Sequence, residues 1–121
     1  MRADEPESFG GDNTGPSPYE YVTAGLGACT SITLRMYADR KDWPLESVEV
    51  RLHHEKIHAA DCEDCDVQEG KIDRVELRIR IIGDELTDEQ RQRLLEIAHK
   101  CPVHNTLTRA NQIVTTLDES D

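Results

Sequence analysis

Cysteine is the residue type with the widest chemistry in this chain of 121 residues, which carries Cys29, Cys62, Cys65 and Cys101. A cysteine thiolate is a strong nucleophile that peroxides oxidise to a sulfenic acid, and a second thiol converts that acid to a disulfide. Cysteines at suitable spacing also bind zinc. The alternative for each is an inert core position, because free cysteine is among the most buried residue types.

Cys29 lies in a segment that the pattern predicts to be helical from residue 17 to about residue 41. Residues 22–34 include no charged side chain, and a helix that is uncharged on every side is typically buried on every side. Gly25 and Gly27 are unfavourable in a helix, which indicates the close approach of another element. We therefore expect a central helix packed under a sheet and against its copy in a partner chain.

Capping boxes predict where two helices begin. In this motif an N-cap hydroxyl and the side chain three residues later each accept from the other's backbone N–H. Ser17 and Glu20 have this spacing, with Pro18 at the first helical position. Thr87 and Gln90 repeat it before a second apolar pattern.

Cys101 belongs to the apolar face of that second helix. The residues of this face recur at helical spacing: Leu94, Ile97, Ala98 and Cys101. Pro102 ends or breaks the helix because proline lacks the N–H that the next turn needs. Residues 105–110 are expected to add one more helical turn.

Alternation of apolar and polar residues predicts three strands, at residues 47–57, 73–82 and 112–117. The first two are expected to form an antiparallel pair with a long connection. Residues 1–16 are rich in Gly, Pro and Asp and are predicted to form an extended arm. Because the chain is too short for two domains, the prediction is a single α+β domain over residues 1–121.

The acidic connection between the first two strands contains a Cys-x-x-Cys pair, Cys62 and Cys65, with His58 four residues upstream. This spacing is compatible with a zinc site, and such a pair also acts as a redox couple in other proteins. Competing carboxylates favour an ordinary loop with auxiliary thiols. No other feature of the sequence requires a cofactor.

The formal net charge of −11 argues against two classes of partner. Nucleic acids and anionic membranes are bound by clustered Lys and Arg, which the sequence lacks. The first residues are charged where a secretion signal is apolar, and no apolar run is long enough for a bilayer. These features predict a cytoplasmic protein, in which thiols stay reduced.

Two segments around the cysteines resemble the OsmC/Ohr family, the osmotically inducible and organic hydroperoxide resistance proteins. The first is Gly15-Pro16-Ser17-Pro18 followed by Ala24-Gly25-Leu26-Gly27-Ala28-Cys29-Thr30, and the second is Lys100-Cys101-Pro102-Val103-His104. They are similar to the family's Asn-Pro…Ala-Cys helix and to its Cys-Pro-Val segment. The likeness extends over residues 3–117.

The resemblance implies an antiparallel sheet packed on a long buried central helix, assembled as an intertwined homodimer. It also implies a thiol peroxidase that reduces organic hydroperoxides in the response to oxidative stress. Cys29 would be the peroxidatic thiol, Cys101 the resolving thiol, and a dithiol such as a lipoyl group the reductant. The alternative is a protein that binds a small hydrophobic ligand without turning it over.

Members of that family have an Arg on an N-terminal hairpin and a Glu ten residues before the reactive Cys. The Glu position here is Tyr19, so the neighbouring Glu20 is the candidate for the same role, beside its role in the capping box. Only sixteen residues precede Ser17. The resemblance is therefore to a short member without the hairpin.

Overall fold

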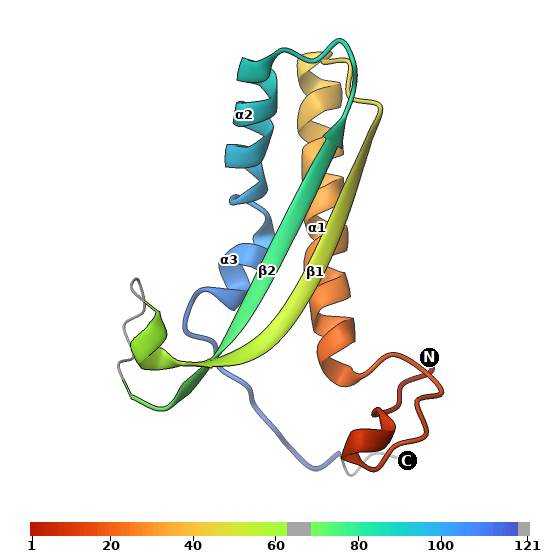
Figure 1. Cartoon of the computed structure of the whole chain (residues 1–121), viewed down its shortest axis with the longest axis vertical. Helices are drawn as coiled ribbons and strands as arrows, with labels where there is room; N and C mark the ends of the chain where they lie inside the picture. The colour runs from red at the N-terminus through yellow and green to blue at the C-terminus, as the bar shows by residue number, and fades with distance from the viewer. Residues whose placement is uncertain (63–68, 119–121) are drawn as a thin grey trace.

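The computed structural model describes residues 1–62 and 69–118 and combines helices with an antiparallel pair of strands (Figure 1). Its elements are a 3₁₀ turn at Glu7–Phe9, α1 at Pro18–Lys41, β1 at Ser47–His58, a 3₁₀ turn at Ala59–Asp61, β2 at Lys71–Ile82, α2 at Asp88–Ala98 and α3 at Pro102–Leu107. The predicted α+β class is confirmed. So is the order helix, strand, strand, helix.

Both predicted capping boxes are present. The Ser17 hydroxyl accepts from the Glu20 N–H, and the Glu20 carboxylate accepts from the Ser17 N–H, each at 3.2 Å. Thr87 and Gln90 bond each other in the same way, at 3.1 and 3.0 Å. The starts of α1 and α2 therefore follow from local sequence, because these bonds satisfy backbone donors that a helix start leaves free.

β1 and β2 form a long hairpin that lies along α1 (Figure 1). Ser47 pairs with Ile82 at one end of the hairpin, and His58 pairs with Lys71 at the other. Half-buried and exposed residues alternate along β1. Since successive side chains of a strand point to opposite faces, one face of the hairpin packs on α1 and the other is exposed.

The glycines of α1 differ in what surrounds them. A Cβ added at Gly27 would lie 2.6 Å from Leu52 Cδ1, which is too close for an ordinary contact. A Cβ added at Gly25 would have nothing within 4 Å. The predicted close approach of another element is therefore present at Gly27, where α1 meets β1, and is not present at Gly25 within the described chain.

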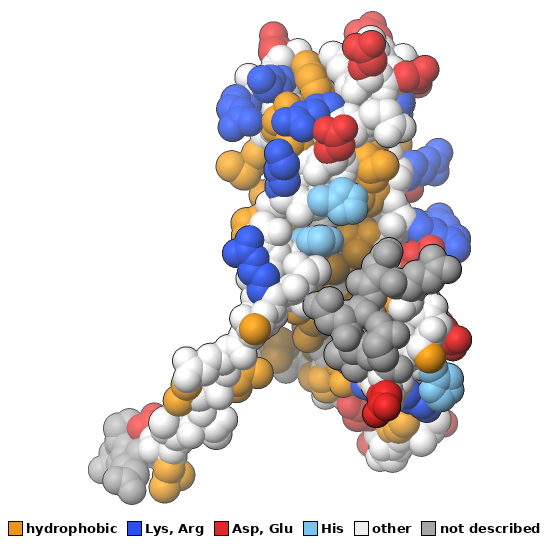
Figure 2. Space-filling view, turned by 90° about the vertical axis from the view of Figure 1, so that its left-hand side faces the viewer, with side chains coloured by type: hydrophobic (Ala, Val, Ile, Leu, Met, Phe, Trp, Pro, Cys, Tyr) orange, Lys and Arg blue, Asp and Glu red, His pale blue; other side chains and the backbone are white. Residues whose placement is uncertain are grey.

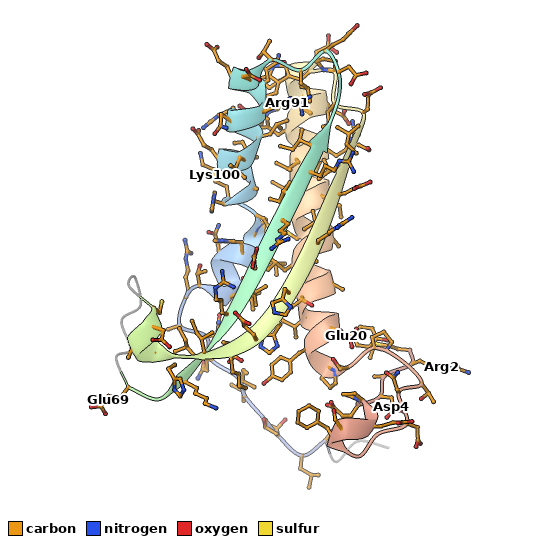
Figure 3. The ribbon with its side chains drawn as sticks, viewed as in Figure 1. Arg2, Asp4, Glu20, Glu69, Arg91 and Lys100 are labelled. Atoms are coloured by element: carbon orange, nitrogen blue, oxygen red, sulfur yellow. The ribbon has the colours of Figure 1, made fainter. Side chains whose placement is uncertain are left out.

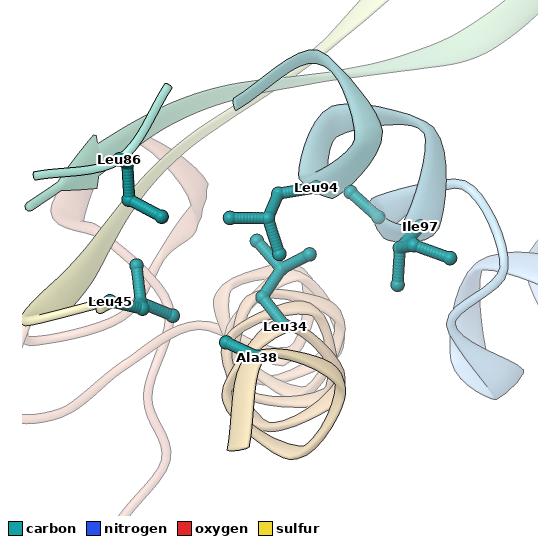
Figure 4. Close-up of a cluster of buried hydrophobic side chains, with 7 residues drawn as sticks. Leu34, Ala38, Leu45, Leu86, Leu94 and Ile97 are labelled. Carbon is teal, nitrogen blue, oxygen red and sulfur yellow. The ribbon is translucent and has the colours of Figure 1, made fainter. Parts of the chain in front are cut away.

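The core lies between α1, α2 and the segments that flank the hairpin (Figure 4). It is made of aliphatic side chains: Leu34, Ala38, Leu45, Leu86, Leu94, Ile97 and Ala98. Leu34 and Leu94 are fully buried, and burial of a leucine side chain stabilises a fold by about 1.5–3 kcal/mol. This packing holds α2, and the chain that follows it, against α1.

The predicted burial of α1, by a sheet and by its copy in a partner chain, is present only in part within the single chain. The hairpin and α2 pack against other sides of α1, while Val22, Ile32 and Met36 are 50%, 59% and 67% exposed. An uncharged stripe on a helix indicates a surface that is covered. No element of the described residues covers this one.

The predicted strand at residues 112–117 is also not formed. Residues 111–118 have no helix or strand structure, and Ile113 and Leu117 are 90% and 83% exposed. Figure 1 shows this segment leading away from the hairpin. An alternating pattern makes a segment suited to a sheet, but a strand also needs an edge to pair with, and within the described residues this segment pairs with none.

Charged side chains of both signs are spread over the surface on the α2 side of the molecule (Figure 2). Hydrophobic side chains appear between them. Over the part of the chain that is described, no helix has both the length and the apolar character of a membrane span.

We predict that Leu34→Ala lowers the free energy of unfolding by about 2–5 kcal/mol, because it leaves a cavity in the core. Leu95→Ala is the matched control, since Leu95 is 42% exposed, and its effect is expected below about 1 kcal/mol. Denaturant unfolding followed by circular dichroism measures both. Equal effects would contradict the assignment of the core.

Candidate active site

The junction between α2 and α3 places Cys101. α2 ends at Ala98, and α3 begins at Pro102, which occupies the first helical position with Cys101 as N-cap. The predicted helix break at Pro102 is therefore present, although the following turn covers Pro102–Leu107 rather than residues 105–110. Cys101 is completely buried, and its Sγ accepts from the His104 N–H at 3.5 Å.

The thiols of Cys29 and Cys101 meet. Both cysteines have free thiols, and the Cys101 thiol donates a hydrogen bond to Cys29 Sγ. The contact joins the middle of α1 to the start of α3, two elements that pack directly against each other. Two residues far apart in the sequence are thus brought to one site, as a disulfide between them would require.

The surroundings of Cys29 favour its thiolate. Burial opposes ionisation, but it is outweighed by three hydrogen bonds to the sulfur, from the Cys101 thiol, the Val103 backbone N–H and the Thr33 hydroxyl. Together these bonds hold the pKa of Cys29 below its usual value. All three donors are neutral groups, so the negative charge is stabilised by hydrogen bonding rather than by a cation.

The pKa of Cys101 is shifted in the opposite direction. Burial, and then the hydrogen bond that its thiol donates to Cys29, raise the pKa of Cys101 more than the backbone N–H groups of His104 and Val103 lower it. Because the two sulfurs share one hydrogen bond, ionisation of one thiol opposes ionisation of the other. Cys29 is therefore the thiol that ionises first, and Cys101 stays protonated.

A shallow groove of about 510 Å³ opens beside this pair. Its lining residues are Thr33, Met36, Tyr37, Arg40, Ile97 and Pro102. Thr33 bonds to Cys29, and Pro102 follows Cys101 in the chain. The groove therefore begins at neighbours of the two cysteines and follows α1 toward its C-terminal end.

Positive charge surrounds Tyr37 along this groove. The guanidinium carbons of Arg40 and Arg93 lie 5.2 and 5.8 Å from the ring centroid, and Lys41 Nζ lies 5.8 Å from it. Arg93 Nε donates to the phenol oxygen at 3.2 Å, and this bond holds the pKa of Tyr37 below its usual value. The groove thus has an apolar start and a positively charged far part.

Comparison with known families identifies the chain. The family model described as OsmC-like protein matches residues 11–116, a range that contains both cysteines of the site. The chain belongs to the OsmC family. No match was found among curated protein sequences.

Solved structures agree with this assignment. The OsmC organic hydroperoxide resistance protein of Legionella pneumophila is 25% identical with a TM-score of 0.65, over 87% of this chain and 71% of that one. The organic hydroperoxide resistance protein of Elizabethkingia anophelis is 25% identical with a TM-score of 0.63, over 86% and 69%. OhrB of Bacillus subtilis is 22% identical with a TM-score of 0.59, over 79% and 65%, and shows the fold alone.

Glu20 is not brought to the thiols in this OsmC-family chain. Its carboxylate bonds to the Ser17 backbone, and Figure 3 shows it at the beginning of α1. Nine residues of helix separate it from Cys29, a rise of about 13 Å. Tyr19, at the family's Glu position, stacks on His54 with 4.4 Å between ring centroids.

Arg35, the charged residue of α1 nearest to Cys29 in sequence, is also occupied elsewhere. Its guanidinium donates to the backbone carbonyls of Leu45 and Glu46 at 2.8 Å each. Arg35 therefore ties α1 to the start of β1. It has a structural role away from the thiol pair.

The zinc hypothesis at the loop is not tested by the described residues. His58 is exposed at the end of β1 and Cys62 is half-buried, whereas Cys65 lies outside the described residues. Within residues 1–62 and 69–118, no group of at least three His, Cys, Asp or Glu is placed to hold a metal ion. The metal site at His58, Cys62 and Cys65 stays a prediction.

Sequence reasoning did not identify Thr33 and Val103 as part of the site. Thr33 could have been found from its spacing, because residues four apart on a helix are neighbours and Thr33 follows Cys29 by four. The Val103 N–H could not have been found from the sequence, since its contact with Cys29 depends on how α3 packs on α1. Main-chain donors leave no residue-type signal in a sequence.

We predict that Thr33→Val slows alkylation of Cys29 by iodoacetamide at pH 7 by about two- to tenfold. The hydroxyl stabilises the thiolate, so its removal raises the pKa of Cys29 and shifts the pH–rate profile to higher pH. Thr23→Val is the matched control, because the Thr23 hydroxyl bonds to the Glu20 carbonyl on the same helix. An unchanged profile for Thr33→Val would contradict the hydrogen bond.

Proposed function

We propose that this chain is a cysteine-based thiol peroxidase that reduces organic hydroperoxides in the cytoplasm as part of the oxidative-stress response. The observation that carries the proposal is the contact between Cys29, with a lowered pKa, and Cys101, with a raised one. Membership of the OsmC family supports it, as do the structural relatives named for organic hydroperoxide resistance.

The first step uses Cys29 alone. Its thiolate attacks the terminal oxygen of a hydroperoxide ROOH, the O–O bond breaks, and the alkoxide takes a proton to leave as the alcohol ROH. Cys29 becomes a sulfenic acid. The hydrogen bonds from Val103 and Thr33 hold the sulfur ionised and fix its position for this attack.

The second step uses Cys101. Its sulfur attacks the Cys29 sulfenic acid, the S–O bond breaks, and a disulfide and water are formed. The contact between the two thiols means that the backbone has little distance to move before the bond can close. A dithiol reductant, such as a lipoyl group, then restores both thiols by thiol–disulfide exchange.

The groove beside the thiols suits the organic part of the substrate. Met36, Ile97 and Pro102 give it an apolar wall. An alkyl group placed there leaves water, which favours organic hydroperoxides over hydrogen peroxide by about 25 cal/mol for each Å² of apolar surface buried. The same groove also suits the alternative function, binding of a small hydrophobic ligand without reaction.

A second copy of the chain is the proposed cover for the exposed side of α1. That side is apolar and uncharged at Val22, Ile32 and Met36, and small at Gly25, where an added Cβ would meet open space. Two such helices can pack closely because small residues let backbones approach. The proposed assembly is therefore a homodimer in which α1 meets its copy.

For activity, we predict that reduced protein consumes cumene hydroperoxide in the presence of dihydrolipoamide. Cys29→Ser abolishes this consumption because the nucleophile is lost. Cys101→Ser still reacts once, and a dimedone-type probe traps the Cys29 sulfenic acid. Peroxide loss and probe labelling measured by mass spectrometry distinguish the two variants, with Ser31→Ala as a control on the same helix.

If the wild-type protein leaves the hydroperoxide unchanged and no sulfenic acid is trapped, the peroxidase proposal is wrong. Retention of a hydrophobic fluorescent probe that Met36→Asp displaces would then support ligand binding in the groove.

For assembly, we predict that Ile32→Glu converts a dimer to a monomer. It places a charge in the apolar contact between two copies of α1, where an unpaired buried charge costs several kcal/mol. Leu95→Glu, an exposed leucine on α2, should leave the dimer intact. Sedimentation velocity measures both, and a monomeric wild-type protein would overturn the proposal.

A further inference from the structure

Arg51 and Arg78 occupy directly opposite positions in β1 and β2, and both are exposed. They belong to a row of four opposed pairs along the outer face of the hairpin: Glu49 with Arg80, Arg51 with Arg78, His53 with Glu76, and Glu55 with Arg74. Three of the pairs place a basic side chain opposite an acidic one, which favours strand pairing. The Arg51–Arg78 pair places two positive charges opposite each other, which opposes it.

The carboxylates on either side of this pair are bonded to other arginines, or to only one member of the pair. Glu49 pairs with Arg80 at 3.6 Å, and Glu76 pairs with Arg78 at 2.9 Å. Within residues 1–62 and 69–118, the Arg51 side chain makes no hydrogen bond or ion pair. The donors of its guanidinium are therefore available to a ligand.

Two shallow hollows, of about 300 and 270 Å³, lie at this pair, and Arg51 and Arg78 line both of them. The other lining side chains with a charge or an imidazole ring are Glu49, His53, Glu76 and Arg80. Three guanidiniums thus face two carboxylates, which gives the hollows an excess of positive charge. The excess is local, because the whole chain has a net charge of −11.

We propose that the Arg51–Arg78 pair binds the phosphate group of a small phosphate-bearing molecule. A phosphate group carries between one and two negative charges and several acceptor oxygens. Guanidinium groups bind such oxygens in a bidentate manner, and two of them can hold one phosphate from both strands. A bound phosphate supplies the negative charge that the pair lacks, so it relieves the repulsion between the two arginines.

The surroundings of the pair limit the ligand to a small molecule. Glu49 and Glu76 flank the pair along the two strands, so a nucleic acid or an anionic membrane would meet carboxylates beyond it. The pair is also separate from the thiols. Leu52, the next residue after Arg51, points to the inner face of the hairpin and contacts α1 at Gly27. The inference is therefore independent of the proposed peroxidase function.

The test is a titration of the full chain with inorganic phosphate at pH 7.5. Sodium chloride is adjusted to keep the ionic strength constant, because salt screens exposed charges. The NMR signals of the backbone amides of β1 and β2 and of the arginine Nε–H groups measure binding. Arg51→Gln removes the unpaired guanidinium. Arg74→Gln is the matched control, since it removes the same charge from the same face at a residue that is paired with Glu55.

In the wild-type protein we expect saturable shifts centred on Arg51 and Arg78. Arg51→Gln should weaken phosphate binding by about tenfold or more, the loss typical of one hydrogen bond to a charged group. Arg74→Gln should change it by less than about twofold, because a screened charge outside the hollows contributes little.

Arg51→Glu gives a second readout that does not depend on the strength of binding. It places an acidic side chain opposite Arg78, so phosphate binding should be lost while the urea midpoint of unfolding rises. Such an exchange of binding for stability is expected where a like-charge pair is kept for a ligand.

Absence of saturable phosphate binding to the wild-type protein would overturn the proposal. Equal weakening by Arg51→Gln and Arg74→Gln would also overturn it, because it would show only a general attraction between charges. A urea midpoint of Arg51→Glu below that of wild type would do the same, since the arginine pair would then support the hairpin. Sedimentation with phosphatidate vesicles, without binding of inorganic phosphate, would replace the small ligand by a membrane surface.

Discussion

The hydrogen bond between the thiols of Cys29 and Cys101 is the interaction on which the site depends. It exists because α3 begins at Pro102, directly after Cys101. Pro102 stops α2 and starts a new helix, and the break turns the N-cap Cys101 inward against α1. The core around Leu34 and Leu94 holds α2 against α1, so the stability of the fold and the geometry of the sulfur pair have the same origin.

The pKa values of the two thiols differ mostly because of neutral groups around them. Cys29 accepts from a thiol, a backbone N–H and a hydroxyl, whereas Cys101 donates to its neighbour and is more deeply enclosed. Acidic side chains outnumber basic ones in this protein, yet Glu20, the charged candidate from the sequence, bonds to the Ser17 backbone instead. Hydrogen bonding is thus the means by which this chain sets the pKa values of the two thiols apart.

Local patterns predicted much of the fold. The capping boxes at Ser17 and Thr87, the alternation in β1 and β2 and the break at Pro102 all depend on neighbours within a few residues. The burial of α1 is only partly accounted for within one chain, and the predicted strand at residues 112–117 is not formed. The apolar stripe of α1 and the alternating residues 112–117 both need a surface to cover them or an edge to pair with, and a sequence does not state where that surface is.

For the site, sequence indicated the two cysteines but not the groups that make them different. The Val103 N–H and the groove toward Tyr37 arise only when α3 and α2 pack on α1.

Disulfide mapping after one equivalent of an organic hydroperoxide tests the account most directly, by mass spectrometry of peptides from non-reduced digests. The account predicts one new linkage, Cys29 to Cys101, with an equivalent amount of alcohol released. Peptides in which Cys29 and Cys101 both remain free thiols, with the hydroperoxide intact, would contradict it.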